Sequence, residues 1–329
     1  GPEPPPPPPP GLLPRHWAEL ERSAIAADVA ALNVASFGPG TARHWESERA
    51  ELIRYARHRI ATESTTGRGH PQGQAGHLSG ALQRLDQRYR HLAAGGWRSL
   101  SATVAGLPRF DQWKPDTPRA RADKPGRSIR YEAPPACPDG GGLLLPTIPP
   151  RCWRLICERQ GLPVPDADTM AAGFWPWALA TPALELLVCE GWKKALAAVS
   201  AGRAAVALPG VQMGRRLLGD ADRQPGRQPS RLIAELQALN HRKRYRIASD
   251  GPPRYKAGRP WLIAFDAESS PTTAGKVAAA AGALAQALRA AGGRPAVARL
   301  PLLPGSGKAG LDDLLLALGP DGLAQGQQQ

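Results

Sequence analysis

The feature that most constrains the fold of this chain is an alternation of short apolar runs with alanine-rich helical stretches from residue 181 onward. Strands separated by helices of about ten to twenty residues require right-handed crossovers and give a parallel sheet. The predicted class is therefore α/β, a Rossmann-like parallel sheet with flanking helices. The strands are expected at Leu184–Cys189, Ala204–Leu208, Trp261–Phe265 and Pro295–Leu300, and the helices at Trp192–Ala201, Pro229–His241, Thr272–Ala291 and Leu311–Leu318.

The rest of the chain divides by composition into three further parts. Residues 1–14 are rich in proline, which excludes the interior of a helix or a sheet, so a disordered, extended tail is predicted. Residues 15–130 have apolar residues at helical spacing and predict a helical or irregular accessory region. Residues 131–319 form the predicted α/β domain, whose residues 143–157 are expected to be strand-like or irregular, and 320–329 are a tail.

Positive charge is concentrated in one segment of the predicted α/β domain. The chain has a net charge of +14, and residues 211–260 contain 12 Lys/Arg against 4 Asp/Glu. A local excess of this kind is typical of a binding surface for a polyanion, nucleic acid before an anionic membrane. We predict that the run Arg242, Lys243 and Arg244 contacts phosphates. A second basic strip, residues 114–130, is either a solvated connector or a phosphate-contacting loop.

The cellular setting is predicted from what the sequence lacks. The four cysteines have no metal-site spacing and are expected to be reduced in a cytosol. The sequence contains no run of about 18 apolar residues and no visible signal peptide. A cytoplasmic protein without a membrane partner is expected.

Acidic residues follow two of the predicted strands. Glu190 ends the first strand, and Asp266 and Glu268 follow the third. Ligands of open parallel sheets sit at the carboxyl ends of the strands, so these three acids are predicted to converge as catalytic residues and metal ligands. Mg²⁺, with Mn²⁺ as a substitute, suits such carboxylates. Lys193 and Lys194, in the next helical turn, are predicted to meet phosphate oxygens at the amide-rich helix start.

Other interpretations of these residues remain open. Glu190 can instead cap the next helix, and Asp266-Ala267-Glu268 can be a solvated loop. The run Gly305-Ser306-Gly307-Lys308 is not a phosphate-binding loop, because that loop needs a glycine and a Ser or Thr where Leu302 and Ala309 stand. Asp312 and Asp313 favour the positive N-terminus of the last helix, or one of them joins the metal shell.

Four motifs in order give a family resemblance: "LLVCEG", "VALPGV", "LIAFDAE" and "GLDDLL". Together they resemble the TOPRIM fold of bacterial primases, topoisomerases and small nucleases, and more closely the TOPRIM-like domain of cyanobacterial-type plasmid replication proteins. The resemblance implies that Glu190 is an acid/base, Asp266 the first metal aspartate, and Glu268 a replacement of the second aspartate of Asp-x-Asp. It also implies a longer protein with a helicase-like ATPase region.

The function expected from the residues and the resemblance together is that of a DNA-replication module of a plasmid or phage-type replication protein. Its chemistry would be Mg²⁺-dependent nucleotidyl or phosphoryl transfer on DNA, primase-like rather than nicking. The alternative is a non-catalytic DNA-binding platform that recruits a helicase or polymerase, favoured by the glutamate at position 268 and by the basic insertion 211–260. A third interpretation is an α/β enzyme acting on a small molecule.

Overall fold

The computed structural model describes most of the chain. The described residues are 7–65, 83–104, 107, 109–134, 142–217, 230–240, 244–245, 254–255 and 258–321, with the backbone alone at 56–65, 217, 244–245 and 254–255.

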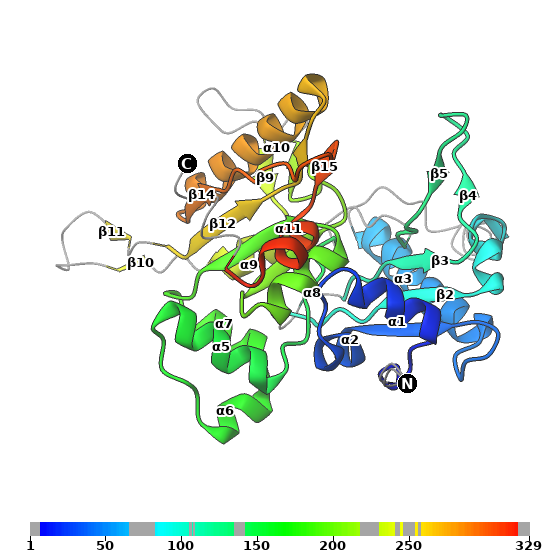
Figure 1. The fold of residues 1–329 in the computed structure, drawn as a ribbon, viewed down its shortest axis with the longest axis horizontal. Coiled ribbons are helices and arrows are strands. Elements are labelled where there is room, and N and C mark those ends of the chain that lie inside the picture. Colours follow the sequence, from blue (N-terminus) through cyan, green and yellow to red (C-terminus); the bar gives the residue numbers. More distant parts are fainter. Residues whose placement is uncertain are drawn as a thin grey trace.

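Four parallel strands form the sheet at the centre of the molecule (Figure 1). Their order is β14-β12-β6-β7. Strands β6, β7 and β12 are almost wholly buried, as expected for apolar runs covered on both faces, whereas β14 is a largely exposed edge. The predicted α/β class and parallel sheet are confirmed, with small shifts at the strand ends. The strands are β6 Leu186–Glu190, β7 Ala205–Leu208, β12 Pro260–Ala264 and β14 Arg294–Val297.

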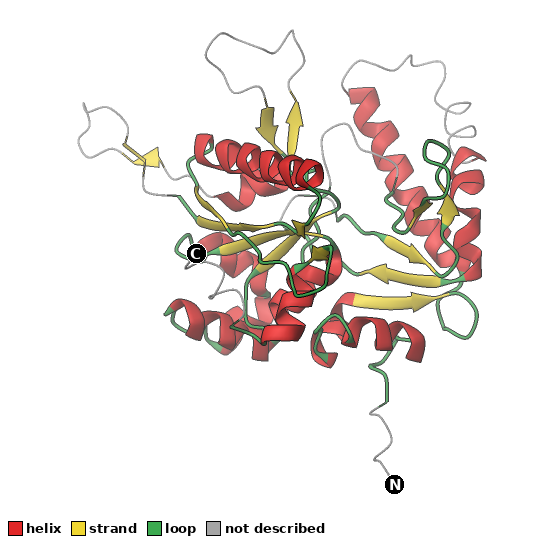
Figure 2. Cartoon of the chain, turned by 45° about the horizontal axis from the view of Figure 1, so that its top comes forward, coloured by secondary structure: helices red, strands yellow, loops and turns green. Residues whose placement is uncertain are grey.

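Helices cover both faces of this sheet. Helix α8 (Trp192–Ser200) connects β6 to β7, and α10 (Pro271–Ala290) connects β12 to β14. The two crossovers run in opposite directions across the sheet, so right-handed connections place the two helices on opposite faces. Figure 2 shows α10 lying across one face. The last helix, α11 (Leu311–Leu318), packs against α8. The predicted helices of this half are present. The packing of α11 against α8 brings the N-termini of these two helices close together.

A group of helices precedes the sheet where less regular structure was expected. Residues 143–157 were predicted to be strand-like or irregular, but α5 (Pro150–Gln160) begins within them, followed by α6 (Ala167–Ala172) and α7 (Phe174–Ala180). Pro150 occupies the first turn of α5, where a missing N–H costs nothing, and Gly161 ends it in the left-handed conformation with φ of 61°. These two residues delimit a helix that its apolar pattern alone did not reveal.

The N-terminal region is not purely helical. It contains the expected helices α1 (Pro14–Glu21), α2 (Ala27–Asn33) and α3 (Trp45–Thr65), and 83–89 continue as helix into η2 (Arg90–Ala94). It also contains an antiparallel sheet that was not predicted, formed by β1 (Val34–Phe37), β2 (Gly96–Ser99) and β3 (Trp113–Pro115). A Cβ on Gly96 would lie 2.2 Å from the Lys114 carbonyl oxygen, so this sheet depends on a close backbone approach between distant segments.

Parts of the basic segment 211–260 are described. They comprise β8 (Arg215–Leu217), β9 (Ser230–Leu232), α9 (Ala234–Asn240), β10 (Arg244–Tyr245) and β11 (Arg254–Tyr255). The helix predicted from Pro229 thus starts as a strand and becomes helical at Ala234. Arg242 and Lys243 lie outside the described residues, and Arg244 is described by its backbone only. The predicted phosphate contacts of this basic run remain a prediction.

A continuous hydrophobic cluster joins the N-terminal region to the sheet. It runs from Trp17 and Val29 to the strands and helices of the α/β half. Trp192 at the start of α8 is 1% exposed, and its indole N–H donates to the Asn33 carbonyl oxygen at the end of α2 (3.1 Å). The N-terminal region is thereby fixed against the start of α8. Among the described residues, no helix has both the length and the apolar character needed to cross a membrane.

Candidate functional site

Two acids lie at the same edge of the parallel sheet because the strands that carry them are neighbours. In the β6–β12 register, Cys189 is the partner of Ala264, so Glu190 and Asp266 both leave the sheet at its carboxyl edge. Gly191 follows Glu190 with φ of 92° and is the N-cap of α8. That conformation suits glycine and lets the chain turn directly from strand to helix. The predicted convergence of these two acids is present in the structure.

Asp266 is the most buried acid of this edge, with 4% of its surface exposed. Its Oδ2 atom lies 3.2 Å from Lys194 Nζ and 2.9 Å from Lys308 Nζ. Its Oδ1 atom is buried without a hydrogen-bond partner among the described residues. A buried carboxylate oxygen without a partner is costly in free energy. The free Oδ1 therefore marks a position where a cation or a hydrogen-bond donor would bind favourably.

Glu268 lies on the same side of the chain as Asp266, as the spacing of two predicted. It belongs to β13 (Ala267–Glu268), which pairs antiparallel with β15 (Lys308–Ala309). Its Oε1 atom is 2.9 Å from Lys308 Nζ, so Lys308 forms ion pairs with both acids. The charge of Glu268 is thus directed at a lysine, and Lys308 is a member of the site that the sequence motifs do not predict.

The two lysines predicted to contact phosphate have different surroundings. Lys194 turns to Asp266. Lys193 instead pairs with Glu19 of α1, with Nζ 3.1 Å from Oε1. Glu19 also binds Lys114 Nζ at 2.5 Å. Lys193 therefore links the sheet edge to the N-terminal region, and Lys194 is the better placed of the two for a substrate phosphate at Asp266.

A further acid reaches the site from the start of α11. A Cβ added to Gly310 would lie 2.5 Å from Lys194 Cε, 2.6 Å from Asp312 Oδ1 and 3.4 Å from Asp266 Oδ1, so these three side chains converge on that glycine. Asp313 instead accepts a hydrogen bond from the Gly310 N–H (2.8 Å), which is the helix-capping role predicted first. Two consecutive acids thus separate, with Asp313 capping and Asp312 facing the site.

The pKa values at this edge reflect burial and crowded charge. Burial, reinforced by the charge of Asp266, raises the pKa of the Glu190 carboxyl above its ordinary value. Burial also raises the pKa of Asp312, against the attraction of Lys194. For Lys194, burial opposes the charged form, but the attraction of Asp266 and Asp312 outweighs it and raises the lysine pKa. A carboxyl with a raised pKa beside fixed charges is an arrangement that general acids and bases share with structural ion-pair networks.

The donor set suits a hard divalent ion that keeps part of its hydration shell. No group of three or more His, Cys, Asp or Glu side chains in the described ranges could by itself hold a metal ion. Mg²⁺ is bound in proteins by one or two carboxylates, with waters and substrate phosphates as its other ligands. The free Oδ1 of Asp266, with Glu190 and Asp312 close by, fits this mode. The fit requires Lys308, whose side chain is 54% exposed, to leave Asp266.

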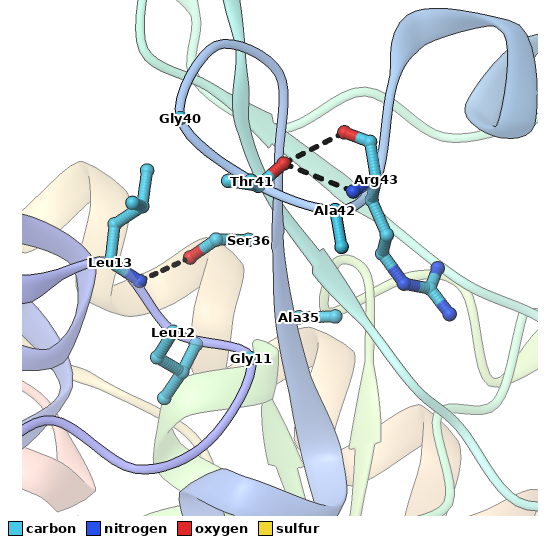
Figure 3. A pocket seen from close by; sticks show the side chains of 9 residues that line it. All are labelled: Gly11, Leu12, Leu13, Ala35, Ser36, Gly40, Thr41, Ala42 and Arg43. Carbon is cyan, nitrogen blue, oxygen red and sulfur yellow. Dashed lines mark hydrogen bonds between the residues drawn. The ribbon is translucent and has the colours of Figure 1, made fainter.

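A pocket of about 380 Å³ lies elsewhere, in the N-terminal region (Figure 3). Ser36, on its wall, lies 2.7 Å by its Oγ from His16 Nδ1, and His16 Nε2 is 2.8 Å from Asp116 Oδ1. The serine oxygen also accepts the Leu13 N–H at the start of α1 (2.8 Å). This Ser-His-Asp chain ties α1 to β1 and to the end of β3, and the predicted acids lie outside the pocket lining. The residues lining the pocket are Gly11, Leu12, Leu13, Ala35, Ser36, Gly40, Thr41, Ala42 and Arg43.

Three comparisons show which known proteins this chain is similar to. A family model described as a domain of unknown function (DUF3854) matches residues 174–322, which include the sheet and the acidic edge. An uncharacterized protein of Picosynechococcus sp. is 34% identical over 156 residues, 46% of this chain and 15% of that protein. The chain thus spans 15% of the length of this curated relative. The Aquifex aeolicus primase structure (zinc binding and RNA polymerase domains) gives a TM-score of 0.42 at 13% identity, covering 94% of this chain and 55% of that one.

Proposed function

We propose that this chain is a DNA-processing module that performs Mg²⁺-dependent nucleotidyl or phosphoryl transfer, with primer synthesis as its reaction. The observation that carries the proposal is the convergence of Glu190, Asp266 and Asp312 with Lys194 at the carboxyl edge of the parallel sheet. Ligand sites of such sheets lie at this edge. The resemblance of the four motifs to TOPRIM proteins gives the direction of the chemistry, and it makes the chain part of a cytoplasmic plasmid or phage-type replication protein with a helicase-like region.

Each residue of the edge has a distinct role in this proposal. Asp266, with Asp312 or Glu190, would hold Mg²⁺, which would neutralise phosphate charge and lower the pKa of an attacking hydroxyl. Glu190, whose pKa is raised by burial, keeps a proton to higher pH than an exposed glutamate and serves as the acid/base. Lys194 remains at Asp266 and contacts a phosphate oxygen of the substrate. Lys308 exchanges its carboxylate partners for substrate phosphate.

A priming and nicking assay on single- and double-stranded DNA, with and without Mg²⁺, tests the proposal. Glu190→Gln and Asp266→Asn are each expected to lower the rate on the order of 10²-fold or more, the usual effect of losing an acid/base or a metal ligand. The matched control is Asp168→Asn, which removes an exposed acid in the first turn of α6 and should leave the rate unchanged. Wild-type rates in both site variants would refute the catalytic role.

A second function is favoured by a specific observation, the ion pairs of Lys308 with Asp266 and Glu268. Lysines that already neutralise both carboxylates are compatible with a non-catalytic DNA-binding platform that recruits a helicase or polymerase. Both functions predict DNA binding that weakens with salt. Binding of Mn²⁺, followed by electron paramagnetic resonance, separates them: the catalytic module binds the ion and loses it in Asp266→Asn, and the platform does not bind it.

A further inference from the structure

A two-stranded hairpin stands out from the body of the N-terminal region (Figure 1). It consists of β4 (Arg119–Ala120) and β5 (Ser128–Ile129), paired antiparallel, and the connection between them. We call residues 119–130 the arm. Its end is a defined turn: the Arg127 N–H donates to the Lys124 carbonyl oxygen (3.1 Å). Pro125 and Gly126 lie between them, and Gly126 has φ of 78°. Proline followed by a glycine of positive φ is the signature of a type II turn, so the arm has an ordered tip.

The base of the arm is anchored in the protein interior. Glu132, 1% exposed, binds the Arg119 guanidinium through both carboxylate oxygens, with Nε–Oε1 at 2.5 Å and Nη2–Oε2 at 3.2 Å. The backbones of Glu132 and Trp113 exchange two hydrogen bonds, of 2.7 and 2.9 Å. A bidentate pair with a buried carboxylate fixes direction as well as distance. The arm is therefore held in a set orientation.

The arm exposes three cations without ion-pair partners. Arg119 is used by Glu132, and Arg121 binds the exposed Asp123 at 2.7 Å. Lys124, Arg127 and Arg130 are exposed, and none of them forms an ion pair within the described part of the chain. Fully extended at about 3.3 Å per residue, the six residues from the anchor to the tip would reach at most roughly 20 Å. Lys124 and Arg127 thus carry unpaired charge at the tip of the arm, and Arg130 carries it at the base.

The composition of the arm favours a nucleic acid over an anionic membrane as its partner. Membrane-surface segments combine basic residues with Trp, Phe or Leu that enter the acyl region. Between Arg121 and Ser128 the arm has no large apolar residue. Its cations therefore suit phosphates in water, and a two-stranded antiparallel ribbon has the width that the major groove of duplex DNA admits.

A chain of ion pairs connects the strand that leads into the arm with the acidic edge of the sheet. Lys114 of β3, which leads into the arm, binds Glu19, and Glu19 binds Lys193. Lys193 directly precedes Lys194, which contacts Asp266. A duplex held by the arm would therefore continue past the site where chemistry is proposed.

We propose that the arm grips the phosphate backbone of duplex DNA beside the acidic edge, with Lys124, Arg127 and Arg130 as its contacts. The choice of DNA as the polyanion rests on the proposed function, but the role of the arm in binding does not depend on catalysis at Asp266.

The test compares two triple variants of the full chain. Lys124→Ser/Arg127→Ser/Arg130→Ser removes the free cations of the arm, and Arg154→Ser/Lys276→Ser/Arg289→Ser removes three exposed cations from α5 and α10. Fluorescence anisotropy gives the dissociation constant for a 20-base-pair duplex over a series of salt concentrations. Each lost phosphate contact lowers the slope of log K against log salt by about 0.9, so the arm variant should lose up to about 2.7, and the control less than one such step.

The same measurement on single-stranded DNA and on vesicles that contain an anionic lipid separates the possible partners. Equal slopes for the two variants would overturn the proposal, as would a loss confined to single-stranded DNA or to vesicles containing an anionic lipid. Glu190→Gln should keep the wild-type slope of log K against log salt. The experiment therefore distinguishes a loss of catalysis from a loss of DNA binding by the arm. If neither the wild type nor any variant synthesises primers, but the arm variant alone loses salt dependence of DNA binding, the proposal for the arm is supported and the catalytic proposal fails.

Discussion

Replacing Lys308 by methionine should tighten the binding of a divalent ion at the acidic edge. Lys308 Nζ lies 2.9 Å from both Asp266 Oδ2 and Glu268 Oε1, and it thus takes the position next to the carboxylates that a cation would need. Methionine keeps a long unbranched side chain and removes the charge. Lys308 itself is half-exposed, whereas the side chains of Asp266 and Glu268 are largely buried, at 2% and 17% exposure. Asp266 keeps its ion pair with Lys194 in the variant, so the variant should remain folded.

The size of the effect follows from Coulomb's law. Two unit charges about 4 Å apart interact by about 1 kcal/mol in bulk water and by about 4 kcal/mol at an effective dielectric constant near 20. The Lys308 side chain is 54% exposed, so the water limit is the nearer one. A divalent ion doubles the interaction, and movement of the lysine relieves part of it. About 1–2 kcal/mol of repulsion should disappear, which corresponds to roughly 5- to 30-fold tighter binding.

Mn²⁺ titration followed by electron paramagnetic resonance, without nucleic acid, measures this affinity directly. Lys276→Met on α10, which removes an exposed lysine from another surface, is the control and should change the affinity less than twofold. Unchanged or weaker Mn²⁺ binding in Lys308→Met would refute the reasoning, because no repulsion between lysine and ion would then exist at this edge.

Three further predictions concern single side chains. Burial, with the charge of Asp266, raises the folded-state pKa of Glu190. The contribution of Glu190 to stability is therefore complete below the unfolded-state pKa and is lost as the pH rises through the folded-state pKa. In urea unfolding, Glu190→Gln should gain stability over wild type as the pH rises, and a stability difference that stays constant with pH would contradict this prediction. Asp312→Asn should weaken Mn²⁺ binding about tenfold or more, whereas Glu268→Asp should change it less than threefold, as calorimetry can measure. Arg259→Met should lower the free energy of unfolding by about 3–5 kcal/mol in urea titrations, because the buried guanidinium donates to four backbone carbonyls and each of them would lose this hydrogen bond; a loss below about 1 kcal/mol would contradict this account.

The parallel sheet could be predicted because its signals are local. Each strand is a continuous apolar run, and each connecting helix, such as α10, has an alanine-rich composition of its own. Adjacent parallel strands also end at one edge, which is why the meeting of Glu190 and Asp266 followed from the order of the elements. Predictions failed where pairing is non-local. Strand β1 finds its partner more than fifty residues away, and its four residues are too few to establish a period.

The partners of the acids were hidden for the same reason. Lys308 is close to Asp266 only because β15 pairs with β13 across forty residues of chain. The run around Lys308 does not fit a nucleotide-binding loop, and no other sequence motif gives this lysine a role. Glu19 reaches Lys193 from α1, near the other end of the chain. Electrostatic partners of this kind have no periodicity, so only the fold reveals them.

The ion pair with Lys308 explains why position 268 carries a glutamate. Strand pairing sets Glu268 directly opposite Lys308, and the longer glutamate side chain reaches Nζ at 2.9 Å while Asp266 holds the same ammonium group from its own strand end. Glu268 and Lys308 therefore act as a pair. The second carboxylate close to Asp266 is that of Asp312, which approaches Asp266 beside Gly310. A side chain at position 310 would collide with Lys194 and Asp312, so the glycine keeps this approach open. The spacing of Asp266 and Glu268 is thus a weak guide to whether this edge can bind a metal ion, and the contrast between Asp312→Asn and Glu268→Asp is the measurement that decides it.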